Sequence, residues 1–275
     1  MGLRRSLYKT PAQLRTMVEP GLITAASLDA VRALVAPGVT TEELDAAASA
    51  VIRGRGAESN FMLVRGYRHT TCISINDQVV HGIPGSRVLE PGDIVSIDSG
   101  AQFQGWNGDS AITVVVPGGD PAVATARQRL SDVTEGSLWA GIAALASARR
   151  VGEIGDAVQS SIEAQGSYGI LRDYVGHGIG RAMHEGPTVF NYRVPDLGPE
   201  VKPGLCLAIE PMVTGGTDVT FVEDDDWTVS TVDGSDGAHW EHSVAVHESG
   251  IWVLTSPDGG ASALAPFGVT PVPIA

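Results

Sequence analysis

The stretch from position 93 to position 109 reads Asp93-Ile-Val-Ser-Ile-Asp98-Ser-Gly-Ala-Gln-Phe-Gln-Gly-Trp-Asn-Gly-Asp109. Its β-branched start predicts a strand, Gln104-Gly105 predicts a turn, and the residues that follow predict a second strand. The midpoint between Asp98 and Asp109 falls next to this turn, so the two carboxylates are expected to be cross-strand neighbours. Facing carboxylates repel and raise at least one pKa, and a metal ion between them removes that cost. Two aspartates that only cap turns are the alternative.

Three further features favour a metal site. Two histidines, His177 and His184, lie in the glycine-rich segment Gly176-His-Gly-Ile-Gly-Arg-Ala-Met-His-Glu-Gly-Pro187, where backbone and ligand can approach closely. Glu210 ends an apolar run over 205–209, and a carboxylate there is costly unless it is paired or bound to metal. Glu241 begins another such run. Together with the two aspartates, these side chains form a set of candidate metal ligands.

Helices are expected in two pairs along the chain. Apolar residues repeat at helical spacing over four ranges, which are 11–36, 41–54, 121–147 and 151–165. A shift of 110 positions aligns Glu43 with Glu153 and Gly56 with Gly166. This self-similarity indicates a duplicated helix–helix–sheet unit within one pseudo-symmetric domain.

The rest of the chain is rich in expected strands. β-Branched segments bounded by Pro, Gly and Asn predict strands over 71–75, 93–100, 111–116, 205–209, 242–247 and 251–255. The last two are expected to form a hairpin. The catalytic domain is therefore expected to span 1–256. The segment 257–275 is rich in Pro, Gly and Ala, and is expected to form a poorly packed tail.

The charge balance restricts the partners. Lys and Arg number 18 and Asp and Glu number 32, which gives a formal net charge of −14. Such an acidic chain is not expected to bind nucleic acid or an anionic membrane as its main partner, but it is compatible with cations and positively charged peptide N-termini. The two cysteines, Cys72 and Cys206, are too few for a disulfide framework and indicate a reducing compartment. With no signal-peptide pattern and no long apolar run, the expected location is cytoplasmic.

In their order and spacing, these segments resemble the methionine aminopeptidase family of the pita-bread fold. The resemblance extends from about residue 11 to residue 255. Its most specific segments are Cys72-Ile-Ser-Ile-Asn76, His81-Gly-Ile-Pro84, Asp98 with Gly108-Asp109, Gly176-His-Gly-Ile-Gly-Arg181 with His184, Ile209-Glu-Pro-Met212, and Trp240-Glu-His242. It implies an α+β pita-bread fold, with pseudo-two-fold duplicated helix–helix–sheet units around a curved antiparallel sheet. The short spacing between His184 and Glu210 resembles the type I branch, since type II enzymes have a long insertion there.

The resemblance also implies a role for each candidate. The implied metal ligands are Asp98, Asp109, His177, Glu210 and Glu241, with Asp109 and Glu241 bridging two divalent ions. Such ions lower the pKa of bound water and polarise the scissile carbonyl. Four carboxylates and one imidazole suit Mn(II), Fe(II) or Co(II) better than a structural zinc, and the identity among Co, Mn, Fe and Zn stays open.

The implied catalytic residues are His81, His184 and Glu210. By resemblance, Glu210 takes the proton from the attacking water. His184 stabilises the tetrahedral oxyanion, and His81 positions the substrate amide or aids the leaving amine. Of the other histidines, those at 69, 242 and 247 are expected at the surface or in the core. His239, two positions before Glu241, is the exception that could support a metal ligand from behind.

A pocket for the methionine side chain is implied by the same resemblance. Its lining would be Phe61, Tyr67, Cys72, His81, Met183 and Trp227, although Phe61 and Met183 could equally be plain core. The chain departs from the family in two places. Leu63-Val-Arg-Gly-Tyr-Arg68 stands where the family usually has Gly-Tyr-His-Gly-Tyr-Pro, and Met183 stands where Phe is common. Both departures concern the pocket and leave the metal centre intact.

The implied function is removal of the initiator methionine from nascent proteins, with a small second residue favoured. The expected partners are nascent polypeptide N-termini at the ribosome, and the expected state is a monomer. An X-Pro aminopeptidase shares the fold and metal set, but Asp98 comes too early for the additional N-terminal domain of those relatives. A non-catalytic binding module is disfavoured because all five ligands are present. A specialised or inhibitor-resistant methionine aminopeptidase paralogue is the alternative that the departures over 61–70 favour.

Overall fold

The strand–turn–strand segment forms a long hairpin in a computed structural model that describes residues 7–275. Its strands are β4 (Ile94–Phe103) and β5 (Trp106–Val115). Gln104 and Gly105 connect them with φ angles of 51° and 74°. A two-residue turn with both residues in the left-handed region matches the right-handed twist of the flanking strands. The predicted turn is therefore confirmed at these two residues.

The register of this hairpin corrects one expectation. Asp98 pairs with Ala111, and Asp109 pairs with Gly100. Because the turn is centred between Gln104 and Gly105, later than the midpoint of the two aspartates, Asp98 and Asp109 are diagonal neighbours and not directly opposite. Residues two apart on a strand share a face, so both aspartates still project from the same face.

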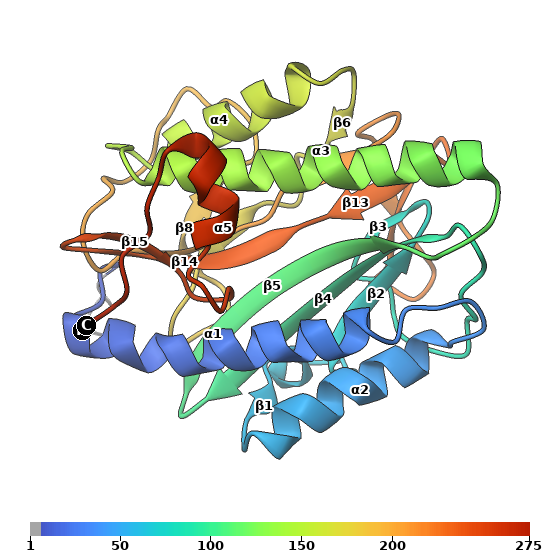
Figure 1. Ribbon diagram of the computed structural model, residues 1–275, viewed down its shortest axis with the longest axis horizontal. Coiled ribbons are helices and arrows are strands. Elements are labelled where there is room, and N and C mark those ends of the chain that lie inside the picture. The colour runs from blue at the N-terminus through green and yellow to red at the C-terminus, as the bar shows by residue number, and fades with distance from the viewer. Residues whose placement is uncertain (1–6) are drawn as a thin grey trace.

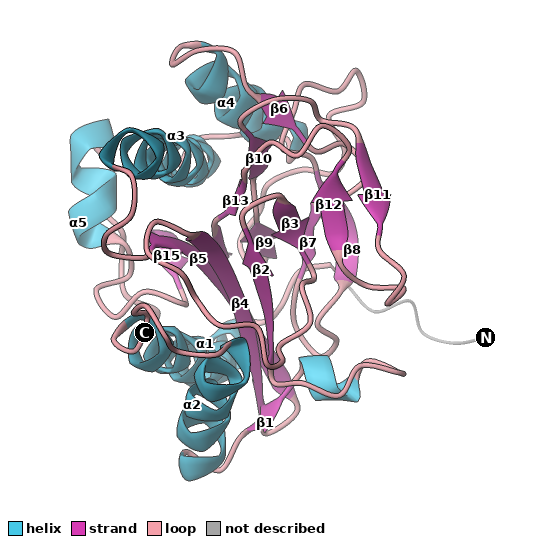
Figure 2. Ribbon diagram, turned by 90° about the vertical axis from the view of Figure 1, so that its right-hand side faces the viewer, coloured by secondary structure: helices cyan, strands magenta, loops and turns pink. Residues whose placement is uncertain are grey.

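A curved antiparallel sheet is built outward from this hairpin (Figures 1 and 2). Within the described residues, its main path runs β1-β4-β5-β14-β9-β7-β8, while β2 pairs with β4 and β15 pairs with β14. The added strands are β1 (Glu58–Ser59), β2 (Thr71–Ile75), β7 (Gly176–Gly178), β8 (Glu185–Val189), β9 (Cys206–Ile209), β14 (Glu241–His247) and β15 (Gly250–Val253). The predicted strands are confirmed, including the hairpin of β14 and β15.

Two small sheets of three strands each flank the main one in the described part of the chain. The first orders β13 (Gly237–His239), β10 (Met212–Thr214) and β6 (Gly169–Ile170). The second orders β11 (Thr220–Val222), β12 (Val229–Thr231) and β3 (Gln78–Val80). These strands are two or three residues long, too short to show the alternation from which strands are predicted.

The two pairs of helices lie on one side of the sheet (Figure 2). They are α1 (Pro11–Arg32), α2 (Thr41–Gly54), α3 (Pro121–Leu145) and α4 (Gly152–Glu163), each within four residues of its expected bounds. Apolar residues of the sheet and of these helices form one large buried core. Among residues 7–275, no helix has the length and apolar character that crossing a membrane requires.

The starts of α2 and α4 reflect the predicted duplication. Glu43 accepts a hydrogen bond of 2.8 Å from the backbone N–H of Thr40. One repeat later, Glu153 accepts one of the same length from the backbone N–H of Arg150. The same residue type therefore accepts a backbone N–H from the segment just before each helix, at positions 110 residues apart.

Helix α1 lies directly on the strand that holds Asp109. A Cβ atom added at Gly108 would lie only 2.7 Å from the carbonyl oxygen of Pro20. The hydroxyl of Thr24 donates to the carbonyl of Gly108 at 3.2 Å. Glycine at 108 thus permits a close helix–strand approach and fixes the strand beside a candidate ligand.

The C-terminal segment is packed, so the expectation of a poorly packed tail over 257–275 is wrong. The segment forms α5 (Ala261–Leu264) and η2 (Ala265–Phe267). Leu264 is fully buried in the main core. Val272 donates its backbone N–H to the carbonyl of Ile251 at 3.0 Å. The composition indicated loose packing, but a few apolar side chains and backbone pairing with β15 anchor the segment.

Candidate active site

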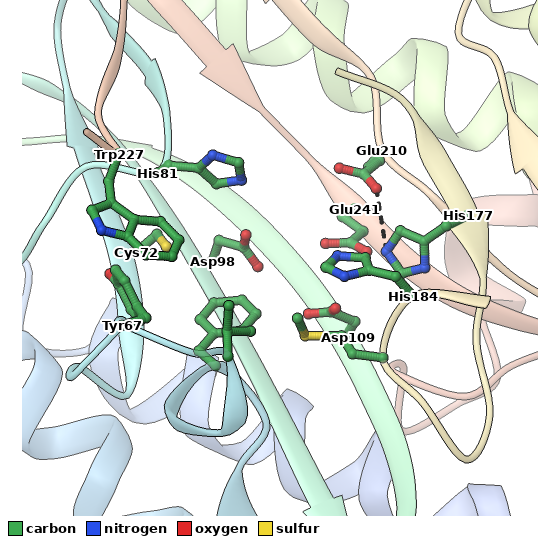
Figure 3. Close-up of a pocket in the computed structure, with 13 residues that line it drawn as sticks. Tyr67, Cys72, His81, Asp98, Asp109, His177, His184, Glu210, Trp227 and Glu241 are labelled. Atoms are coloured by element: carbon green, nitrogen blue, oxygen red, sulfur yellow. Dashed lines mark ion pairs between the residues drawn. The ribbon is translucent and has the colours of Figure 1, made fainter. Parts of the chain in front are cut away.

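Five neighbouring strands bring acidic or imidazole side chains to one cavity. Asp98 lies on β4, Asp109 on β5, Glu241 at the start of β14, Glu210 just after β9, and His177 on β7. These strands are adjacent in the sheet, in that order. Their side chains line a cavity of about 140 Å³ (Figure 3). The five predicted ligands, spread over most of the sequence, therefore converge through the register of a single sheet.

Ala111 shows how this register works. It pairs with Asp98 on one side and with Glu241 on the other. Paired residues of neighbouring strands point to the same face, so these two carboxylates flank β5 from either side. Ala111 places only a methyl group between them, and Asp109 projects from the same strand two positions earlier.

The carboxylates are buried without a counter-charge of their own. Within the described residues, Asp98 Oδ1, Asp109 Oδ1 and Glu241 Oε1 are buried and have no hydrogen-bond partner. Burial raises the pKa of Asp98 and of Glu210 to about 7. It raises the pKa of Asp109 and of Glu241 well above the usual range, and neighbouring carboxylates raise both further. Buried, unpartnered carboxylate oxygens are the surroundings that a divalent cation fits.

Two groups of donor atoms lie close enough to hold an ion. Asp109, His177 and Glu241 each offer a ligand atom within 4.8 Å of the other two, and so do Glu210, His239 and Glu241. Glu241 belongs to both groups. The Nε2 atom of His177 lies 3.5 Å from Oε1 of Glu210, the ion pair dashed in Figure 3.

The two predicted catalytic histidines lie at opposite sides of this cluster (Figure 3). The ring of His184 packs edge-on against that of His177, with centroids 4.5 Å apart. The ring of His81 packs against Tyr174, with centroids 5.5 Å apart. Burial lowers the pKa of His81 to about 4 and lowers the pKa of His184 as well, so both imidazoles are neutral at pH 7.

His81 also has an uncommon backbone conformation. Its φ angle is 62°, in the left-handed region that few residues other than glycine adopt. A Cβ added at the following Gly82 would lie 2.3 Å from the carbonyl oxygen of Ile73, so the chain is tightly packed there. This packing against β2 fixes the direction in which His81 projects into the cavity.

An apolar wall faces the carboxylates across the cavity. Every pocket residue that the resemblance implied lines it, namely Phe61, Tyr67, Cys72, His81, Met183 and Trp227. Tyr67 and Trp227 make an edge contact with centroids 5.0 Å apart. The hydroxyl of Tyr67 donates to the carbonyl of Thr71 at 2.7 Å, which satisfies its polar end. The wall is therefore apolar toward the cavity, with no charged side chain among these residues.

Sequence reasoning missed some residues around the site. Val64 lines the cavity, within the stretch that departs from the family, and Ile83 packs on the same apolar cluster. Tyr174 supports His81. Val64 could have been found from its place between Phe61 and Tyr67. For Tyr174 no sequence signal exists, since its contact with His81 joins distant segments.

The chain belongs to metallopeptidase family M24, whose family model matches residues 15–248. Membership of this family implies the use of divalent metal. Within the family, the chain belongs with the methionine aminopeptidases. Methionine aminopeptidase 1 of Mycobacterium tuberculosis is 46% identical over 260 residues, covering 92% of this chain and 96% of that protein. Methionine aminopeptidase 1 of Bacillus subtilis is 42% identical over 249 residues, covering 90% and 98%.

Solved structures agree with this membership. The methionine aminopeptidase from Thermotoga maritima superimposes with a TM-score of 0.85 at 37% identity, covering 90% of this chain and 98% of that chain. The prolidase from Pyrococcus furiosus has a TM-score of 0.70 at 21% identity and shares the fold alone; this chain covers only 65% of it. The predicted pita-bread fold, family and enzyme class are confirmed.

Proposed function

We propose that this enzyme removes the initiator methionine from nascent proteins and that its five carboxylate and imidazole ligands hold two divalent ions. One observation carries the proposal: an apolar pocket and a cluster of buried carboxylates open onto the same cavity. The pocket fits an unbranched thioether side chain, and the carboxylates lie where the adjoining peptide bond would be. The relatives named methionine aminopeptidase support the same reading.

The residues present fit a dinuclear centre. Asp109 and Glu241 would bridge two ions, with Asp98 on one side and with His177 and Glu210 on the other. The membership of Glu241 in both groups of donor atoms supports its bridging position. Bound divalent ions would polarise the scissile carbonyl and lower the pKa of the attacking water. The oxygen-rich ligands favour Mn(II), Fe(II) or Co(II).

Three side chains act on the attacking water or on the substrate. Glu210 accepts the proton of the attacking water at its carboxylate. A neutral His184 can donate its N–H to the developing oxyanion, and a neutral His81 can hold the substrate amide. By resemblance to the family, the rings of His81 and His184 limit the space for the second residue of the substrate. A small second residue is therefore favoured.

The substrate's free amino group adds selectivity. A free α-amino group has a basic nitrogen that can interact with the carboxylates and the ions they would hold, whereas a formylated one has lost it. The apolar wall offers no fixed charge to a Lys, Arg or Glu side chain at the first position. Peptides that begin with an unblocked methionine are thus the preferred substrates, and formyl-methionine peptides are poor ones.

The cellular setting is part of the proposal. We place the enzyme in the cytoplasm as a monomer that meets nascent N-termini at the ribosome. Free, buried Cys72 and Cys206 are compatible with a reducing compartment. All five proposed ligands come from one chain.

A specialised or inhibitor-resistant paralogue is the second candidate. One observation favours it: Val64 and Met183, the residues at which the chain departs from the pattern of the family it resembles, both line the cavity. Both change the shape of the pocket without touching the ligands. Such an enzyme would retain the reaction and differ in the side chains and inhibitors that it accepts.

Hydrolysis of three tripeptides tests the function. With added Mn(II) or Co(II), Met-Ala-Ser should be cleaved fastest, Met-Lys-Ser slowly and Ala-Pro-Ser not measurably. Asp109→Ala and Glu241→Ala should each abolish turnover, because each removes a bridge to both ions. Asp132→Ala, at an exposed position of α3, should leave the rate unchanged. Faster cleavage of Ala-Pro-Ser would instead identify an X-Pro aminopeptidase, and full activity in chelator would exclude the metal mechanism.

A further inference from the structure

His239 is a buried histidine beside the metal-ligand candidates that has no role in the scheme above. It ends β13, and its side chain is almost fully buried, with 1% exposed. Its backbone N–H lies 3.1 Å from Ser96 Oγ and 3.0 Å from Thr113 Oγ1, which fixes the residue against the hairpin of β4 and β5. Its Nε2 atom is buried and, among the described residues, has no hydrogen-bond partner. A buried ring nitrogen without a partner is unusual and indicates a functional contact.

The group that faces this nitrogen is Glu210. Nε2 of His239 lies 3.6 Å from Oε2 of Glu210. The other oxygen, Oε1, lies 3.5 Å from Nε2 of His177. One carboxylate is therefore held between two imidazoles, one on each oxygen. A separation of 3.6 Å is longer than a hydrogen bond, but a movement of less than about 1 Å closes it, as often happens when an active site takes up its ligands.

We propose that His239 is a positioning residue that donates its Nε2–H to Oε2 of Glu210 and so directs the other oxygen, Oε1, toward the ion shared with His177. This inference rests on the metal centre proposed above. It gives the orphaned nitrogen a partner and assigns separate tasks to the two oxygens of Glu210. An imidazole suits the task, because its ring N–H can donate to a carboxylate oxygen and so fix the direction of the other oxygen.

A direct bond from His239 to an ion is the competing role. The donor atoms of Glu210, His239 and Glu241 lie within 4.8 Å of one another, so distance alone permits it. The lining of the cavity decides between the two roles. All five predicted ligands line the cavity, whereas His239 is not among its lining residues and faces Oε2 of Glu210.

Cobalt titration of the metal-free protein separates these roles without measuring activity. Affinity is followed by calorimetry, and ligand geometry by the visible absorption of bound Co(II). His239→Leu removes the donor, and should weaken binding by about 10–100-fold and alter the spectrum. His239→Gln keeps an N–H donor on a flexible side chain, and should retain the parent's affinity and spectrum. His242→Gln is the matched control, a histidine of β14 that packs on Trp139 of α3, and should also match the parent.

Each outcome supports or overturns the proposal. If His239→Leu is folded by circular dichroism and binds Co(II) like the parent, His239 does not position Glu210. If His239→Gln loses affinity and absorption as fully as His239→Leu, His239 is a ligand and the positioning role is wrong. In a Glu210→Gln background, the His239→Leu change should have little further effect. If His239→Leu does not fold, His239→Asn, whose amide is too short to reach Glu210, takes its place. A parent that binds no Co(II) would overturn the metal centre itself, a result distinct from the others.

Discussion

His81 and His184 stand beside the metal-ligand candidates without belonging to either group of donor atoms. Their rings are neutral and border the cavity that the peptide bond would enter. Replacing either with alanine should lower kcat by on the order of 10²-fold, because a donor to the developing charge or to the substrate amide is lost. Metal content, measured by elemental analysis, should stay at the parent's level. Loss of bound metal in His184→Ala would make this histidine a ligand and contradict the assignment.

Met183 gives the residue-scale prediction on specificity. Its flexible thioether is packed with Phe61 and Trp227 in the apolar wall. The pocket should therefore tolerate norleucine and, to a lesser degree, leucine at the first position. Met183→Phe should narrow this tolerance, because a rigid ring fixes the pocket's shape. The quantity to measure is kcat/KM for Met-, norleucine-, Leu- and Ala-initiated tripeptides.

The matched control is Met62→Phe. Met62 lies on the same segment as Phe61 but is 55% exposed and does not line the cavity. The same substitution there should leave the preference unchanged. A parent enzyme that cleaves Ala- or Leu-initiated peptides faster than Met-initiated ones would be a broad aminopeptidase, and the proposed substrate would be wrong.

Sequence reasoning was most successful for residues that stand in motifs. Glu210 could be predicted because a carboxylate at the end of an apolar strand is costly without a partner. The two aspartates could be predicted from their hairpin. Val64 and Tyr174 could not, because their roles depend on packing between segments that no local pattern relates. His239 could be predicted in part: its position near Glu241 indicated a supporting role, but only the structure shows that it faces Oε2 of Glu210.

At the scale of elements, periodicity predicted the long helices and local composition the longer strands. Strand β2 has its predicted bounds, and α2 is confirmed from first residue to last. Helix α1 ends at Arg32, before the expected position 36, because the last apolar residues form a turn. The expected register of β4 and β5, with Asp98 opposite Asp109, was wrong by two residues. The geometry of the turn, and not the positions of the aspartates, sets the pairing.

A buried ion pair connects the N-terminal segment with the first residue of β8 and with the loop before it. Nζ of Lys9 pairs with Oε2 of Glu185 at 2.9 Å, and only 5% of the lysine side chain is exposed. Oε1 of Glu185 accepts the backbone N–H of Ala182 at 3.1 Å. The pair thus anchors the loop that holds Met183 and His184.

Lys9→Met should therefore destabilise the fold and loosen this loop. It leaves the carboxylate of Glu185 unpaired, at a cost on the order of 2 kcal/mol; removing one partner of a fully buried pair costs about 3–5 kcal/mol, but part of Glu185 reaches solvent. The free energy of unfolding in urea measures the change. Adding Glu185→Gln should recover part of it. Lys202→Met is the control: its pair with Glu200 is more than half exposed, so its loss should change the free energy of unfolding much less than the loss of the Lys9 pair. Equal losses in both variants would show that the Lys9 pair has no special role.

For the whole molecule, the fold and the site depend on one another. The helices cover one side of the curved sheet (Figure 2). The five predicted ligands, which come from five neighbouring strands of that sheet, line one cavity. Composition alone would not have predicted this architecture; the resemblance did, through its separated motifs. The packed C-terminus could not be predicted, because its few apolar anchors, such as Leu264, stand within a stretch otherwise typical of a loose tail.

This dependence predicts how the stability of the metal-free protein varies with pH. Burial raises the native pKa of Asp98 and of Glu210 to about 7, above the value of about 4 that carboxyls have in an unfolded chain. The native state therefore binds more protons than the unfolded state between these values. Stability then falls as pH rises through this window, and the contribution of these two carboxyls is lost as the pH passes through about 7.

Metal should reverse that loss, because it supplies the counter-charge that protons supply at low pH. We expect the Tm of metal-free protein to fall from pH 5 to pH 7.5, and added Mn(II) to raise the Tm far more at pH 7.5 than at pH 5. Asp98→Asn should reduce the pH dependence, because it removes one carboxyl with a raised pKa. Asp132→Asn, an exposed change of the same kind on α3, should leave it intact. Scanning calorimetry measures the Tm at pH 5 and at pH 7.5, each with a chelator and with added Mn(II). A metal-induced shift that is the same at both pH values would mean that the carboxylates are not the groups whose repulsion the ions relieve.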